Sequence, residues 1–243
     1  MEKKSIKHFI IIGIVFAIFI LGAIFLNPTR RIANERKAVA RDLLNKKYNE
    51  TFVIKSYSKI QLMNDYYNVT GYSESNPDLI IEASVNEDGK AVSDNYWAKC
   101  ISKRLSDQIS NDISSQGENY VYSKLLIDDV YQTDTSMSLS ECAEKNILSD
   151  FTIYVFVNNN FNAIKLYEDL ETSLEDKTEI RGTFKIYKTD SKTIEKVKKY
   201  LTTHSDADSG LNQIIKSSTE VNLKYSNGLM EESKNSFMDK IDY

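Results

Sequence analysis

One apolar run near the N-terminus limits what this chain can fold into more than any other feature. Residues 9–26, FIIIGIVFAIFILGAIFL, contain no charged or strongly polar side chain. Roughly 18 to 20 such residues, at about 1.5 Å rise per residue, match the ~30 Å hydrocarbon core of a bilayer. A soluble helix of that length is rarely apolar on all sides. The run therefore predicts a single transmembrane helix.

Two other interpretations of the run are a cleaved export signal and a buried soluble helix. Lys3, Lys4 and Lys7 precede the run and give it the basic tip of an exported segment. Cleavage needs a pattern of small residues, and GAIFLNP offers a poor version of one. No cysteine lies near the run to carry a lipid. We expect an uncleaved anchor at the cell membrane, in contact with membrane lipid.

The side of the membrane on which the remaining chain lies follows less directly. Basic residues flank the run on both sides, so the positive-inside rule does not decide by count. The tail of residues 1–8 is short and has the composition of an export n-region. We therefore predict a cytoplasmic tail at 1–8, the anchor at 9–26 and an extracellular domain.

The chain beyond the anchor is mildly acidic. Residues 1–30 carry four basic residues and one acidic residue, a net charge of +3, so the total of −4 leaves −7 for residues 31–243. This charge is a poor fit for nucleic acid, and we expect no nucleic-acid partner. About 210 residues suffice for one large domain or two small ones. The two cysteines, Cys100 and Cys142, are too few for a disulfide framework or an unaided zinc site. A disulfide bond between them is one alternative for a domain outside the cell, and we expect instead that both are small buried apolar residues.

The first half of the domain is predicted to be a helix followed by a short antiparallel meander. Residues 27–48 have apolar positions near the helical period, and their basic surface would suit lipid headgroups. An ordinary solvated helix face explains the same pattern. Three β-rich runs follow, at 51–61, 66–75 and 78–86, and Asp88–Gly89 marks a turn.

Residues 92–113 predict the clearest helix of the chain. Ser93 is a candidate N-cap. Apolar side chains recur at every fourth position and form one stripe: Trp97, Ile101, Leu105, Ile109 and Ile113. One face of the meander is the expected partner of this stripe.

The second half alternates between strand and helix patterns. Strands are predicted at 120–131, 150–159, 182–190 and 219–228, and helices at 161–174 and 190–204. Ile164 is expected on the inward face of the helix at 161–174, and the C-terminal segment is expected to be frayed. The predicted fold is α+β, with antiparallel sheets and helices in two small lobes, at 49–117 and 118–243.

A resemblance adds to this interpretation. LLNKKYNETFVIKS leads into a strand, NPDLIIEASVNEDGK follows, and DNYW opens the next helix. Over about residues 40–105 this pattern resembles small membrane- or lipid-anchored surface proteins of low-GC Gram-positive bacteria. The resemblance implies a surface location and an α+β fold, and it implies no catalytic residues.

The sequence contains no pattern that assigns catalytic, cofactor-binding or metal-ligating residues. His204 is the sole histidine of the domain and follows a helix end. Asp128–Asp129 end a strand-like run, where neighbouring residues point to opposite faces, and Glu231–Glu232 lie near the polar C-terminus, so both pairs are interpreted as solvated charge. No phosphate-binding glycine motif occurs.

The abundant tyrosines supply the one candidate binding face, for a peptide or glycan, formed by Tyr57, Tyr66, Tyr67 and Tyr72. The leading hypothesis is a membrane-anchored, extracytoplasmic, non-enzymatic binding or accessory module that needs no cofactor. Its partner would be an envelope protein or a cell-wall component. The alternatives are a carboxylate-dependent envelope hydrolase and a membrane-bound regulatory or immunity protein.

Overall fold

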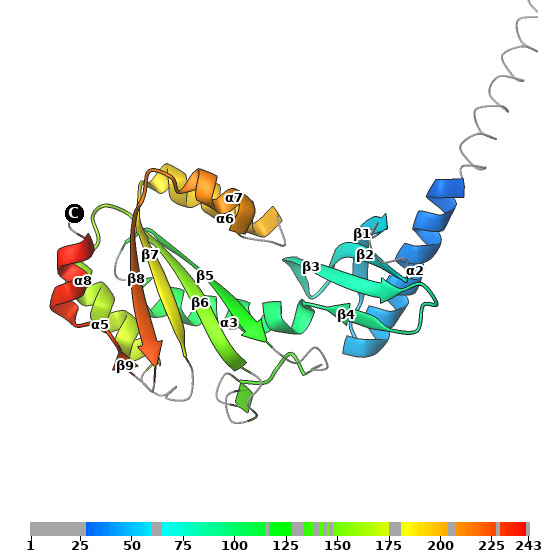
Figure 1. The fold of residues 1–243 in the computed structure, drawn as a ribbon, viewed down its shortest axis with the longest axis horizontal. Coiled ribbons are helices and arrows are strands. Elements are labelled where there is room, and N and C mark those ends of the chain that lie inside the picture. Colours follow the sequence, from blue (N-terminus) through cyan, green and yellow to red (C-terminus); the bar gives the residue numbers. More distant parts are fainter. Residues whose placement is uncertain are drawn as a thin grey trace, which may run out of the picture.

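Two β-sheets, lying beside each other along the long axis of the molecule, organise the chain in the computed structural model (Figure 1). The structure describes residues 28–59, 65–114, 117–127, 134–138, 141–142, 145, 148–174, 181–203, 208–226 and 229–241. Within these residues the chain forms six helices and nine strands. The predicted α+β class is confirmed.

The predicted membrane-spanning helix is the part of the fold prediction that needs correction. Among the helices of the described residues, none is both long enough and apolar enough to cross a bilayer. The longest, α2 (Pro28–Tyr48), carries seven arginines and lysines. The tail at 1–8 and the apolar run at 9–26 lie outside the described residues. The structure supports two sheets with six helices within the described residues. The prediction of a membrane-spanning helix is therefore withdrawn.

The first sheet is an antiparallel meander, as predicted, with a short fourth strand added at its edge. Its strands follow chain order: β1 (Phe52–Lys59), β2 (Tyr66–Ser73), β3 (Asn76–Asn86) and β4 (Val92–Asp94). Gly89 has a φ of +69°, which confirms the predicted turn. One face of the sheet packs on α2, where Ala40 and Leu44 are fully buried.

The second sheet is mixed, which corrects the prediction of antiparallel sheets. Its strands also lie in chain order: β5 (Asn119–Ile127), β6 (Leu148–Val157), β7 (Gly182–Lys188), β8 (Thr219–Ser226) and β9 (Leu229–Met230). β6 and β7 are parallel, and the other pairs are antiparallel. The reason is the helix between β6 and β7, since a crossover helix returns the chain in the same direction.

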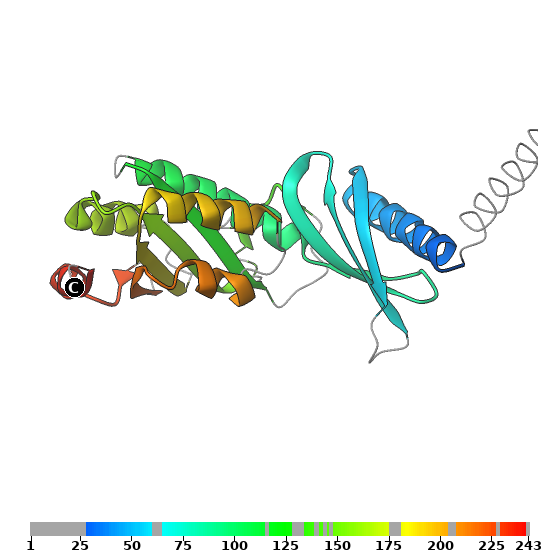
Figure 2. The same cartoon turned by 90° about the horizontal axis from the view of Figure 1, so that it is seen from above.

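Helices cover both faces of the second sheet (Figures 1 and 2). One face packs on three helices, α3 (Tyr96–Asp112), α5 (Ala163–Leu174) and α8 (Lys234–Ile241). The opposite face packs on α6 (Ser191–Thr203) and α7 (Asp208–Ile214). Strand alternation separates the two cores, because Val155 points to the first face and Phe156 to the second.

The helix α3 belongs to both halves of the molecule. Its predicted stripe is buried, but against the second sheet, so the expected packing on the meander is wrong. Tyr96 and Cys100, on another side of the same helix, are buried in the core of the first sheet. Figure 1 shows α3 running beneath β5 and reaching β4. The hydrophobic cores therefore divide the chain differently from the predicted lobes at 49–117 and 118–243.

Three local expectations also differ from the structure. Ser93 is not the N-cap of α3, because residues 92–94 pair with β3 and Asn95 precedes the helix. Ile164 is 43% exposed. The C-terminal segment is the helix α8 rather than a frayed end, since Phe237 and Ile241 are fully buried beside α5.

Candidate binding cleft between the two sheets

The start of α3 is fixed to the first sheet by short polar contacts. The Asp94 carboxylate, whose side chain is fully buried, accepts hydrogen bonds from the Tyr48 hydroxyl at 2.7 Å and the Tyr96 amide at 2.9 Å. Its other oxygen pairs with the ammonium group of Lys47 at 2.8 Å. The Asn95 side chain accepts a hydrogen bond from the Glu82 amide at 2.9 Å. These contacts set the direction in which α3 leaves the first sheet.

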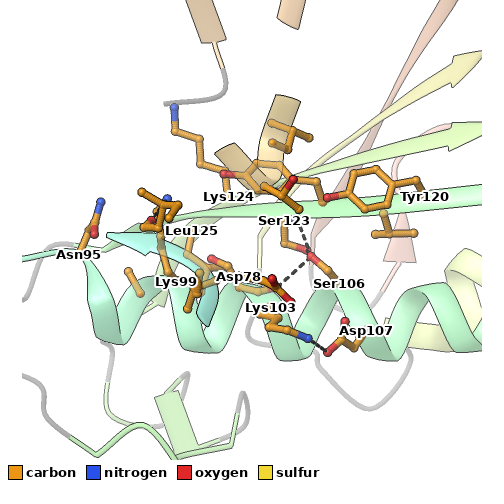
Figure 3. A pocket seen from close by; sticks show the side chains of 18 residues that line it. Asp78, Asn95, Lys99, Lys103, Ser106, Asp107, Tyr120, Ser123, Lys124 and Leu125 are labelled. Atoms are coloured by element: carbon orange, nitrogen blue, oxygen red, sulfur yellow. Dashed lines mark hydrogen bonds and ion pairs between the residues drawn. The ribbon is translucent and has the colours of Figure 1, made fainter. Parts of the chain in front are cut away.

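A cavity of about 390 Å³ lies where α3 passes from the first sheet to the second (Figure 3). Four elements line it, namely the start of β3, the N-terminal half of α3, the strand β5 and the end of α6. Its apolar wall comes from both halves of the molecule: Leu79, Ile80, Ala98, Val121, Leu125 and Leu201. A largely apolar hollow at the junction of two units is the usual location of a ligand site.

The open edge of the second sheet runs along this cavity. β5 is an edge strand and pairs with β6 on one side. The Ser123 amide donates to the Ser106 hydroxyl of α3 at 2.7 Å, so this peptide group points away from β6. Because peptide directions alternate along an antiparallel strand, the groups at Val121 and Leu125 point the same way. Ser106 therefore occupies the backbone amide of Ser123 at this edge. The backbone groups of Val121 and Leu125 face the cavity side.

Charged and aromatic side chains surround the apolar wall. Lys103 and Asp107 form an ion pair at 2.5 Å with about half of each side chain exposed, and Figure 3 shows the pair beside Ser106. The Lys99 ammonium donates to the Ile80 carbonyl at 2.7 Å, which ties α3 to β3. Burial raises the pKa of the Tyr120 hydroxyl to about 12. That hydroxyl stays protonated at neutral pH and can donate a hydrogen bond.

The four tyrosines of the predicted binding face do not share one face. Tyr67 is fully buried under α2, and the ring of Tyr57 packs on it at 5.6 Å between centroids. Tyr66 and Tyr72 lie on the opposite face of β2, where Tyr66 is 42% exposed and Lys55 lies over the Tyr72 ring. Residues 66 and 67 are neighbours, so the strand alternation places them on opposite faces.

Of the other residues considered from the sequence, the structure describes only the Glu231–Glu232 pair. His204 and Asp128–Asp129 lie outside the described residues. Glu231 accepts a hydrogen bond from Ser226, and Glu232 pairs with Lys240 at 2.5 Å. Among the side chains that the structure describes, no group of three or more His, Cys, Asp or Glu residues is placed to hold a metal ion.

Both cysteines are buried, as expected from the sequence, and both are free thiols, so the disulfide alternative is not supported. Cys100 lies in the core of the first sheet, and Cys142 lies in that of the second. Burial raises the pKa of the Cys100 thiol to about 11 and also raises that of Cys142. Both side chains behave as small apolar residues.

The residues that form the cleft were missed by the sequence reasoning, although one signal was present. Ala98, Ser102 and Ser106 are small residues at four-residue spacing, beside the large apolar stripe of the same helix. Such a row leaves room along one side of a helix. Which element lies across that space depends on the packing of the two sheets.

Comparisons with known proteins bear on the fold. The sequence matched no protein-family model and no curated protein. The structure is similar to the crystal structure of a DUF5037 family protein from Ruminococcus gnavus, with a TM-score of 0.68 and 18% sequence identity. The match covers 85% of this chain and 98% of that chain. At this identity the likeness shows a shared fold, and the resemblance to Gram-positive surface proteins stays a prediction.

Proposed function

We propose that this chain is a non-enzymatic binding module that holds an extended segment of a partner protein in the cleft between its two sheets. The observation that carries the proposal is the cavity along the open edge of β5. An extended peptide can use both features of this place, because its main chain pairs with a strand edge while its side chains enter an apolar hollow.

The lining of the cleft favours a peptide over a glycan. Six apolar side chains contribute to its wall, and the polar groups lie beside them as serine hydroxyls and charged side chains. Peptide segments combine apolar side chains with regularly spaced amide groups, which matches this arrangement. The predicted envelope partner, the hydrolase alternative and the regulatory alternative stay predictions.

The test is a selection of random-sequence peptides displayed on phage against the full-length chain, followed by affinity measurements on one selected peptide. The variant is Ser102→Trp, which places a large ring in the cavity from the half-buried side of α3. The matched control is Asn111→Trp, an exposed position near the end of the same helix. We expect Ser102→Trp to weaken binding at least about tenfold, because the ring occupies the ligand volume, and the control to bind as the wild type does.

Equal binding to the two variants, with equal melting temperatures, would contradict the proposal. The same selected peptide also tests the non-enzymatic part. Mass spectrometry after prolonged incubation with the protein should show the peptide intact, whereas a cleavage product in stoichiometric excess over protein would favour the hydrolase alternative.

A further inference from the structure

The start of β3 is a second strand edge in the cleft, besides that of β5. Residues 78–80 line the cavity, and Figure 1 shows β3 beginning next to the second sheet, on the side of its edge strand β5. β4 pairs with β3 only at residues 83–85. In the part of the chain that the structure describes, no strand therefore pairs with residues 78–80 on the side of β4. β3 and β5 belong to different sheets and do not pair with each other.

The backbone of β3 directs polar groups toward α3 and the cleft. The Asn95 side chain accepts a hydrogen bond from the Glu82 amide, and the Asn95 amide donates to the Glu82 carbonyl at 3.2 Å. Two residues earlier, the Ile80 carbonyl accepts a hydrogen bond from the Lys99 ammonium at 2.7 Å. The N–H and C=O groups of one strand residue point to the same side, so the Ile80 amide faces the cleft as well. A carbonyl has two lone pairs, and that of Ile80 can accept one more hydrogen bond.

β5 contributes backbone groups to the same cavity from the other sheet. The Ser123 amide donates to Ser106, and the groups of Val121 and Leu125 point to the same side of the strand. The cleft therefore offers backbone hydrogen-bonding groups from two strands, one of each sheet.

Helices form the remaining walls of the cleft. α3 contributes the small side chains of Ala98, Ser102 and Ser106, and α6 contributes Leu201 and Thr202. α3 packs on one face of the second sheet and α6 on the other. An extended segment in the cleft would thus have a strand edge on each side of its main chain. Its side chains would point alternately toward α3 and toward α6.

We propose that the partner segment enters the cleft as a single strand whose main chain bonds to β5 on one side and to the start of β3 on the other. This inference rests on the proposed function and defines the class of partner. A strand at the edge of a folded sheet has only one free side, because its other side pairs with a neighbour. That neighbour would take the place of β3. The partner segment is therefore a disordered stretch or a chain terminus that becomes a strand on binding.

Replacement of single backbone amides in the bound peptide tests the pairing on two sides. One peptide selected against the full-length chain is synthesised with each amide in turn changed to an ester, which removes one N–H donor and adds no bulk. Amide directions alternate along a strand, so pairing with β5 alone makes only every second position sensitive. Pairing with both edges makes positions of both sets sensitive. We expect at least about fivefold weaker binding at one or more positions of each set.

Sensitivity confined to alternate positions would overturn the pairing on two sides and leave the proposed function standing. Binding that no ester weakens, or that Ser102→Trp leaves unchanged, would instead contradict the proposed function itself. Amide exchange measured by NMR on the labelled full-length chain is the second readout. With the peptide bound, we expect slower exchange at Ile80 as well as at Val121 and Leu125. Unchanged exchange at Ile80, with slower exchange at the other two, would also overturn the inference.

The class of partner has its own test, in which the selected sequence is built into one strand of a disulfide-closed β-hairpin. The hairpin should bind at least about tenfold more weakly than the linear peptide, because its second strand occupies one side of the first. Equal binding of the hairpin and the linear peptide would show that one free side is enough, and would overturn the assignment to a disordered segment or terminus.

Discussion

Asp94 shows how one side chain connects the two halves of this molecule. Its carboxylate is fully buried, pairs with Lys47 of α2 and accepts hydrogen bonds from Tyr48 and from the first residue of α3. A charge in this position depends on its partners for stabilisation, because the side chain has no exposed surface. The geometry of the cleft depends on these contacts, since they set where α3 begins.

We expect Asp94→Ala to destabilise the protein by about 3 kcal/mol, because it leaves Lys47 and Tyr48 without their buried partner. The matched control is Asp88→Ala, which breaks an exposed pair with Lys90 and should cost less than about 1 kcal/mol. Urea unfolding monitored by the fluorescence of Trp97 measures both. Equal midpoints for the two variants would show that the Asp94 contacts contribute little to stability.

At the scale of elements, α3 is the helix that joins the two sheets. Its apolar stripe was visible in the sequence, because large side chains recur at every fourth position. Its partner was not visible, since an apolar stripe fits either sheet equally well. The second sheet contains the parallel pair β6–β7 and therefore buries both of its faces under helices. It offers α3 a larger apolar surface than the meander, which α2 already covers.

The packing of α3 on the second sheet predicts which region is destabilised when one side chain of its apolar stripe is truncated. Leu105→Ala removes a fully buried side chain from the second core and should cost about 2–5 kcal/mol. Hydrogen exchange should accelerate in β5, which contacts α3, and in β6, which belongs to the same core, and should change less in β1 and β2. Faster exchange concentrated in β1 and β2 would contradict this packing and would support the predicted packing of α3 on the meander.

At the scale of the whole molecule, the sequence predicted the elements better than the site. The meander, the turn at Gly89 and the helical stripe of α3 all follow from local patterns. The membrane-spanning helix was predicted from the length of one uninterrupted apolar run, and no helix of the described chain has that character. The cleft could not be predicted, because its wall combines Leu79, Val121 and Leu201, which lie on three separate elements. The tyrosine binding face was predicted from the abundance of tyrosines in this region. Strand alternation places these tyrosines on opposite faces of the first sheet.

The most direct measurement is hydrogen exchange of the full-length chain with and without a selected peptide at saturating concentration. The cleft predicts slower exchange in β5 and in residues 78–80 and 96–107, and no change in the strand β2, which carries Tyr66 and Tyr72. Slower exchange confined to β1 and β2, with β5 unchanged, would contradict the account and place the ligand on the face of the first sheet.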